Sequence, residues 1–200
     1  MLKKEINAYG IKVLLSRHPA IRQLKKSNMP MSHGNRFWWS SWLLMDYLKK
    51  TGLTKGSHVM EIGCGWGLAG IYCAKRHGAR VTGIDIDGDV LPFAKLHAEI
   101  NNTDVTFIKK GFDGIRIKDL RGVDILLGAD ICFWDSMTDS LKRLIKRAKK
   151  AGVRMVLISD PIRSPFEALC KYFTEGRGGE VLDWIANEPR EILGQILKIE

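Results

Sequence analysis

The sequence predicts an α/β protein with a doubly wound, seven-stranded sheet, and three observations carry this prediction. Between residues 57 and 173, short apolar runs alternate with longer stretches of helical periodicity, as in the successive strand–helix units of a parallel sheet. A glycine-rich turn at residues 63–67 joins the first of these strands to its helix. Two apolar runs, at residues 180–186 and 191–199, close the chain, and the short connection between them predicts an antiparallel hairpin.

The individual elements follow from periodicity and from breaker residues. An apolar helical face at Trp42, Met45 and Leu48 ends at Gly52, which predicts a helix ahead of the sheet. The near-continuous apolar run at residues 123–130 is typical of a strand buried on both faces. The other parallel strands are expected at residues 57–62, 80–85, 104–108 and 153–159, and the helices that connect or follow them at 68–77, 90–100, 137–150 and 166–173.

Length, charge and cysteine pattern exclude several classes of protein. The chain has 200 residues, enough for one domain with its own core. It has no run of eighteen apolar residues and no signal-peptide pattern, so we expect no membrane span and a cytoplasmic protein. The net charge of +10 leaves nucleic acid open as a partner. The cysteines lack metal-ligand spacing, which favours reduced thiols over a metal site or disulfides; they are Cys64, Cys73, Cys132 and Cys170.

The glycine-rich turn and its surroundings predict the ligand. Residues 61–67 read Glu-Ile-Gly-Cys-Gly-Trp-Gly, and such glycines let a ligand lie against bare backbone at the start of a helix. The spacing from Gly65 to Gly70, with Asp85 twenty residues after Gly65, also satisfies the dinucleotide motif. Glu61 distinguishes the two ligand classes, because a carboxylate repels a pyrophosphate and attracts a ligand that carries an ammonium and a sulfonium.

This motif resembles the first motif of the class I, or seven-β-strand, methyltransferases. The resemblance implies a Rossmann-like fold, S-adenosylmethionine as methyl donor and S-adenosylhomocysteine as product. It also implies that Asp85 accepts the ribose hydroxyls and that Phe112 and Asp113 surround the adenine, where a plain turn at Gly111 is the alternative. The full set of implied cofactor-binding residues is Trp38, Glu61, Gly63, Gly65, Gly67, Asp85, Phe112, Asp113 and Ala129.

Three further segments narrow the resemblance to the family-16 protein lysine methyltransferases. Trp38, followed by small residues and a helix, resembles their segment that lies against the methionine part of the cofactor. Asp130-x-x-Phe133 matches their Asp-x-x-(Tyr or Phe) motif, and residues 160–163, Asp-Pro-Ile-Arg, resemble the electron-transfer-flavoprotein lysine methyltransferase branch. The resemblance implies that Asp130 orients the acceptor amine and that Phe133 shapes a channel for its stem. Arg163 would contact an acidic substrate or only pair with Asp160.

The expected organisation is an N-terminal helical arm at residues 1–35 and a methyltransferase domain at residues 36–200. The arm is predicted as one or two short amphipathic helices broken near Pro19, with a turn-rich loop over the site at residues 28–35. The favoured function is protein lysine N-methylation, with a protein substrate as partner. An RNA or small-molecule amine methyltransferase, using the basic helix at 137–150, and a nucleotide-binding oxidoreductase or noncatalytic module stay open. The oligomeric state does not follow from the sequence.

Overall fold

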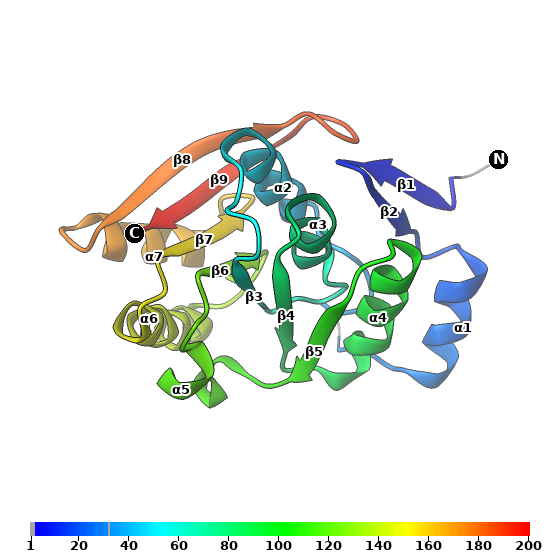
Figure 1. Cartoon of the computed structure of the whole chain (residues 1–200), viewed down its shortest axis with the longest axis horizontal. Helices are drawn as coiled ribbons and strands as arrows, with labels where there is room; N and C mark the ends of the chain where they lie inside the picture. Colours follow the sequence, from blue (N-terminus) through cyan, green and yellow to red (C-terminus); the bar gives the residue numbers. More distant parts are fainter. Residues whose placement is uncertain (1–2, 32) are drawn as a thin grey trace.

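A seven-stranded sheet forms the centre of the protein in a computed structural model that describes residues 3–31 and 33–200 (Figure 1). The strand order is β5–β4–β3–β6–β7–β9–β8; the first five are parallel, and β9 and β8 are antiparallel additions. The predicted α/β sheet with its closing hairpin is thereby confirmed. The strands are β3 (His58–Ile62), β4 (Arg80–Asp85), β5 (Val105–Lys109), β6 (Ile125–Ala129), β7 (Met155–Asp160), β8 (Gly179–Ala186) and β9 (Ile192–Ile199).

Helices cover both faces of this sheet. One face packs on α2, α3 and α4, and the other on α5, α6 and α7. Short 3₁₀ segments, η1 and η2, follow β4 and β5. The bounds are α2 (Ser40–Thr51), α3 (Leu68–His77), η1 (Gly88–Val90), α4 (Leu91–Ile100), η2 (Phe112–Gly114), α5 (Ile117–Leu120), α6 (Asp135–Ala151) and α7 (Ser164–Thr174).

The burial of the strands explains their order in the sheet. β6 and β7 lie in the middle and are buried along almost their whole length, whereas β5 lies at an edge and is largely half-buried or exposed. The chain runs outward from β3 to β5 and then returns to place β6 on the other side of β3. Such a reversal opens a crevice at the carboxyl ends of the strands, where sheets of this kind bind ligands.

The N-terminal segment differs from the predicted helical arm. A two-stranded hairpin, β1 (Glu5–Ala8) and β2 (Ile11–Leu14), precedes a single helix, α1 (Pro19–Ser27). The prediction of helix before Pro19 is therefore wrong, while a helix does begin at that proline. Apolar side chains of β1, β2 and α1 belong to the same core cluster as α2 and α3, so this segment packs on the rest of the chain. Residues 1–2 and 32 of the predicted arm lie outside the described residues.

Buried polar contacts fix the hairpin in place. The Tyr9 hydroxyl donates to Asp46 at 2.8 Å, and the Tyr9 amide donates to Glu188 at 2.8 Å. On the other strand, the Leu14 amide donates to His97 Nε2 at 3.1 Å. Within the described residues, no helix is both long and apolar enough to cross a bilayer.

Candidate active site

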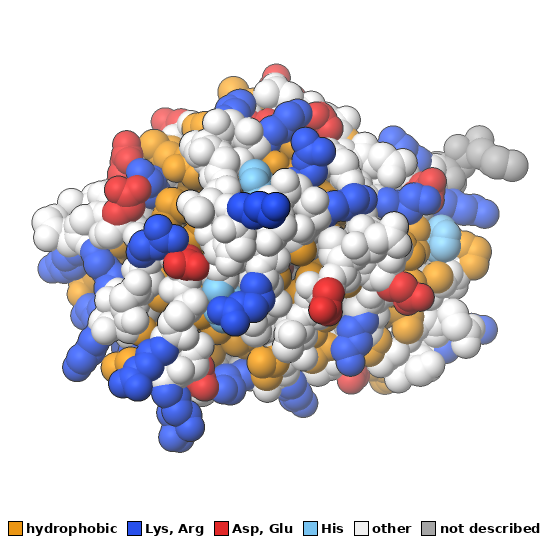
Figure 2. Space-filling model, in the orientation of Figure 1, with side chains coloured by type: hydrophobic (Ala, Val, Ile, Leu, Met, Phe, Trp, Pro, Cys, Tyr) orange, Lys and Arg blue, Asp and Glu red, His pale blue; other side chains and the backbone are white. Residues whose placement is uncertain are grey.

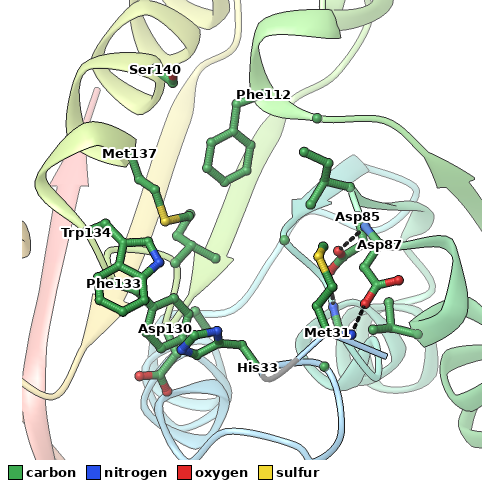
Figure 3. Close-up of a pocket in the computed structure, with 18 of the residues that line it drawn as sticks. Met31, His33, Asp85, Asp87, Phe112, Asp130, Phe133, Trp134, Met137 and Ser140 are labelled. Carbon is green, nitrogen blue, oxygen red and sulfur yellow. Dashed lines mark hydrogen bonds between the residues drawn. The ribbon is translucent and has the colours of Figure 1, made fainter. Parts of the chain in front are cut away.

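A cavity of about 580 Å³ opens at the carboxyl edge of the sheet, at the reversal between β3 and β6 (Figure 3). Its walls come from six places in the chain: Met31 with His33 and Gly34, Trp38, the glycine turn, the β4–η1 connection, residues 111–114, and the end of β6 with the loop after it and the start of α6. Most of the lining is apolar, with a few polar groups among it, which is the usual character of a small-molecule site.

The glycine turn forms the floor of the cavity. Gly65 has φ +51°, and a Cβ built there meets no atom within 4 Å, so bare backbone faces open space. A Cβ on Gly63 would overlap Ile131, which explains the glycine there by close packing. Gly67 begins α3 with φ +73° and abuts Phe107. Gly63 and Gly65 line the cavity, whereas Gly67 does not; the cofactor contact of Gly67 stays a prediction.

Asp85 stands at the end of β4, on the cavity wall. Its carboxylate accepts the amide hydrogens of Gly65 at 2.8 Å and of Asp87 at 2.9 Å, as the dashed lines in Figure 3 show. Burial raises the pKa of this carboxyl. The side chain therefore fixes the glycine turn and lies at the predicted position for a ribose.

Glu61 lies behind the turn instead of in the main cavity. It is 2% exposed and accepts the Gly70 amide hydrogen of α3 at 2.9 Å. Burial raises its pKa to about 8. The carboxylate borders a smaller hollow that also includes Arg36 and shares Trp38, Gly63, Gly65 and Ala129 with the cavity.

The two residues predicted around the adenine lie on the opposite wall and differ in orientation. The Phe112 ring points into the cavity in Figure 3. The Asp113 side chain is mostly exposed and turns to α6, where it accepts hydrogen bonds from Ser140 at 2.8 Å and Arg143 at 3.1 Å. These contacts lower the pKa of Asp113. Both Asp113 oxygens thus have protein partners, and the contact with the adenine stays a prediction.

Aromatic rings gather at the end of the cavity nearest α2 and α6. The Trp38 and Phe133 rings are 5.2 Å apart between centroids, and His33 lies 4.2 Å from Phe133 and 6.0 Å from Trp38. Trp134 is 59% exposed and meets His33 edge-on at 5.8 Å. We call Trp38, His33, Phe133 and Trp134 the aromatic end of the cavity.

Asp130 follows β6 at the aromatic end, but its carboxylate is bound to the protein. The residue is 3% exposed and adopts φ +55°. One oxygen accepts the Ser40 amide hydrogen at the start of α2 at 3.1 Å, and the other pairs with Arg163 at 2.7 Å. In Figure 3 the carboxylate points away from the centre of the cavity. Asp130 thus lies after β6 as expected, and both of its oxygens contact protein groups; the contact with an amine stays a prediction.

Arg163 connects two buried carboxylates with the aromatic end. Its guanidinium pairs with Asp160 at 2.8 Å as well as with Asp130. The same group lies 4.7 Å from the centroid of the Phe133 ring and 5.8 Å from that of Trp38. Burial raises the pKa of Asp160 to about 6. The pairing with Asp160 was one of two sequence alternatives; the second pairing, with Asp130, was not foreseen.

Comparisons with known proteins agree with this architecture. A family model described as a methyltransferase domain matches residues 59–152. A ribosomal protein L11 methyltransferase from Dictyoglomus turgidum is 30% identical over 79% of this chain and 44% of its own length. A crystal structure of a SAM-dependent methyltransferase from Aquifex aeolicus has a TM-score of 0.59, with 19% identity, over 90% of this chain and 98% of that one. The chain has the class I methyltransferase fold.

Solved structures of this fold hold S-adenosyl-L-homocysteine, the product of the expected cofactor S-adenosylmethionine. The Pyrococcus abyssi tRNA (uracil-54, C5)-methyltransferase was solved with S-adenosyl-L-homocysteine; it has a TM-score of 0.61 and 17% identity, over 100% of this chain and 45% of that one. The open backbone at Gly65 and the carboxylate of Asp85 fit such a ligand. The chain spans between 21% and 44% of the length of the most similar curated relatives.

Several residues that line the cavity were not predicted from the sequence to be site residues. Met31 and His33 belong to the turn-rich segment that was predicted to lie over the site, and they do line the cavity. Ile131 and Met137 follow Asp130 along the chain and give no signal of their own beyond apolar character. Cys132 is fully buried, and burial raises the pKa of its thiol, consistent with the expected buried thiol.

The basic face of α6 is engaged within the chain. Arg143 pairs with an η2 carboxylate at 3.1 Å, Arg147 donates to two backbone carbonyl oxygens of residues 112–115, and Lys149 donates to the Glu200 carbonyl oxygen at 2.7 Å. Figure 2 shows lysine and arginine side chains scattered among acidic and apolar ones on the face in view. These contacts weaken the case for a dedicated nucleic-acid surface on α6.

Proposed function

We propose that this chain is an S-adenosylmethionine-dependent methyltransferase whose acceptor is a lysine side chain of a protein. The observation that carries the lysine assignment is the aromatic end of the cavity, which adjoins the glycine turn and is closed by Phe133 and Trp38. Flat apolar rings suit the four-carbon stem of a lysine and attract a cation by about 0.5–2 kcal/mol. The Asp-x-x-Phe resemblance at residues 130–133 favours the same acceptor.

The cofactor, when bound, supplies an activated methyl group. The residues of the chain then act mainly by alignment, which accounts for much of the rate of a two-reactant step. Asp85 and the backbone at Gly65 would hold the ribose and the amino-acid part. Phe133 and Trp38 would hold the lysine stem in line with the methyl group. Asp130 would act through Arg163, because this ion pair stands behind the Phe133 ring and keeps it in place.

The acceptor must arrive as a neutral amine. The unperturbed lysine pKa is about 10.4, and each unit by which it falls towards neutral pH corresponds to about 1.4 kcal/mol. The apolar lining penalises the ammonium by desolvation.

A second candidate acceptor is RNA or a small amine, favoured by the net charge of +10. The internal contacts of the α6 cations weaken this alternative. The name of the Dictyoglomus turgidum relative, a ribosomal protein methyltransferase, favours a protein acceptor. The family model favours a methyltransferase over the oxidoreductase alternative. The cytoplasmic location stays a prediction from the cysteine pattern.

The test combines ligand binding with labelling. Calorimetry should show binding of S-adenosylhomocysteine and none of NAD. Tritiated methyl groups should pass from S-adenosylmethionine into total cell protein, with label released by protease and resistant to RNase. The labelled protein, analysed by mass spectrometry, should carry N-methyl-lysine. Label that RNase removes and protease spares would contradict the lysine acceptor, and binding of NAD alone would contradict the methyltransferase itself.

A further inference from the structure

Methyl transfer to a lysine side chain releases one proton, and the cavity wall holds few groups that accept protons. Among its described lining residues, the titratable side chains are Asp85, Asp87, Asp113, Asp130 and His33. A carboxylate is a much weaker base than an amine. Imidazole is the side chain that ordinarily gains and loses a proton near neutral pH. His33 is therefore the side chain on this wall whose chemistry suits proton transfer.

The four carboxylates are also committed to protein donors. Asp85 and Asp87 accept backbone amide hydrogens of the glycine turn, of residues 87 and 89 and of Met31, over 2.7–2.9 Å. Asp113 and Asp130 each bind an arginine, at 3.1 Å and 2.7 Å. Each of the four carboxylates therefore already has hydrogen-bond or ion-pair partners within the protein.

His33 lies beside the rings that would hold the lysine stem. Its ring is 4.2 Å from Phe133 and 6.0 Å from Trp38 between centroids, within the group that would hold the lysine stem. Figure 3 shows the imidazole directed towards Phe133 and Asp130, at the side of the cavity opposite Phe112. The ring thus borders the path from the aromatic end to the glycine turn.

Two indole N–H groups hold the backbone at His33 and Gly34. The Trp38 indole N–H donates to the His33 carbonyl oxygen at 2.7 Å, and the Trp66 indole N–H donates to the Gly34 carbonyl oxygen at 3.1 Å. Gly34 also packs against Val90, where a Cβ would overlap. These anchors give the imidazole a defined place on the wall.

Charged groups of both signs lie around the aromatic end that contains His33. Arg163 lies behind Phe133 and Arg36 lies 4.4 Å from the Trp38 centroid. On the acidic side, the Asp130 carboxylate is neutralised by Arg163, and Asp87 faces the cavity from the β4–η1 connection. Asp160 also pairs with Arg163, at 2.8 Å, and the half-buried His33 ring has a route to solvent.

We propose that His33 is the catalytic base of this methyltransferase, an inference that rests on the proposed function. An ammonium N–H bond of the lysine breaks, its electron pair stays on nitrogen, and the proton bonds to the imidazole. The amine electron pair then bonds to the methyl carbon as the carbon–sulfur bond breaks. The electron pair of the broken carbon–sulfur bond remains on sulfur, which gives S-adenosylhomocysteine. The imidazolium then passes its proton to water.

The experiment compares His33→Phe and His33→Ala with the wild-type chain in the methyl-transfer assay into total cell protein, from pH 6.5 to pH 10. The phenylalanine keeps an aromatic ring against Phe133, and the alanine leaves room for free imidazole. Affinity for S-adenosylhomocysteine and the unfolding midpoint report on the intact fold. His18→Asn is the matched control, because it removes a histidine at the start of α1 and keeps a capping side chain.

We expect both His33 variants to lose about 100-fold in rate at pH 7, at the lower end of what general-base catalysis contributes. The loss should shrink above pH 9, where more lysine arrives neutral, and added imidazole should restore His33→Ala but not His33→Phe. A pH-independent loss without imidazole rescue, or no loss in His33→Phe, would overturn the assignment of His33 alone. A wild-type chain that binds S-adenosylhomocysteine and labels nothing would overturn the proposed function and the role of His33 together.

Discussion

At the scale of single residues, Glu61 is the group whose protonation should report on the ligand. Its burial raises the pKa to about 8, so the carboxyl is mostly neutral at pH 7 in the free protein. A cation bound beside it favours the ionised form. S-adenosylmethionine carries an ammonium and a sulfonium, so its binding at pH 7 should release a proton from Glu61, and its affinity should rise with pH up to about 8.

Calorimetry in buffers of different ionisation enthalpy measures this release directly. The binding enthalpy of the wild-type chain should vary with the buffer, and that of Glu61→Gln should not. The glutamine keeps an oxygen for the Gly70 amide, so α3 retains its contact. A buffer dependence that survives in Glu61→Gln would show that the proton comes from elsewhere.

Asp130 provides the second prediction at this scale. Asp130→Asn removes the charge that pairs with Arg163, while Arg163 keeps Asp160 at 2.8 Å. Because the guanidinium retains one partner, the loss of stability should stay below the 3–5 kcal/mol of a fully broken buried pair. Turnover should fall by about 100-fold, because the Asp130–Arg163 ion pair that holds the Phe133 ring in place is weakened. Affinity for S-adenosylhomocysteine, measured by calorimetry, should stay within about threefold of wild type. A loss of S-adenosylhomocysteine affinity as large as the loss of turnover would instead make Asp130 a cofactor ligand.

At the scale of elements, the glycine turn offers a paired test of backbone and ligand effects. Gly65 and Gly122 both have positive φ and open space around a built Cβ, but only Gly65 lines the cavity. Alanine should therefore destabilise either position by about 1–2 kcal/mol through left-handed strain. Only Gly65→Ala should weaken S-adenosylhomocysteine binding, by about tenfold or more, because its methyl group enters the space for the ligand. Equal affinities in the two variants would place the ligand away from the turn.

The same scale shows what sequence patterns can and cannot predict. The strands of the central sheet follow from apolar runs whose burial is dictated by the fold, as at residues 125–129. The β1–β2 hairpin was missed because its turn at Tyr9–Gly10 lacks the common Asn-Gly pair. Tyr9 adopts φ +52°, and its stabilising partners, Asp46 and Glu188, are distant in the chain. Local periodicity contains no information on such contacts.

The sequence also predicted some features of the candidate site and not others. Asp85 and Gly65 were found because motif spacing fixes them relative to the strand ends. Whether a carboxylate is open or engaged depends on partners from other elements, as with Asp113 and Arg143 or Asp130 and Arg163. His33 was missed because a lone histidine in a loop carries no spacing signal, and its place is set by the indole that binds its backbone.

At the scale of the whole molecule, the N-terminal hairpin and the sheet share one core, and His97 connects them. It is fully buried, accepts the Leu14 amide hydrogen at Nε2, and stacks on Trp66 with centroids 5.1 Å apart. An acceptor at Nε2 requires neutral imidazole. Burial accordingly lowers the pKa of His97 to about 4, from an ordinary value of 6.5.

The pH dependence of folding should follow from this difference. Between pH 6.5 and pH 4 the unfolded chain binds a proton at His97 and the folded chain does not, so stability falls as pH falls through this window. The full difference corresponds to about 3 kcal/mol. His97→Gln keeps an acceptor for Leu14 without a titrating group, so its stability should fall by about 3 kcal/mol less than wild type over the same window. Urea denaturation of both chains at several pH values measures this. The buried carboxyls Asp160 and Glu61 titrate in both chains and cancel in the comparison, so identical profiles would mean that His97 is not the group that couples the hairpin to pH.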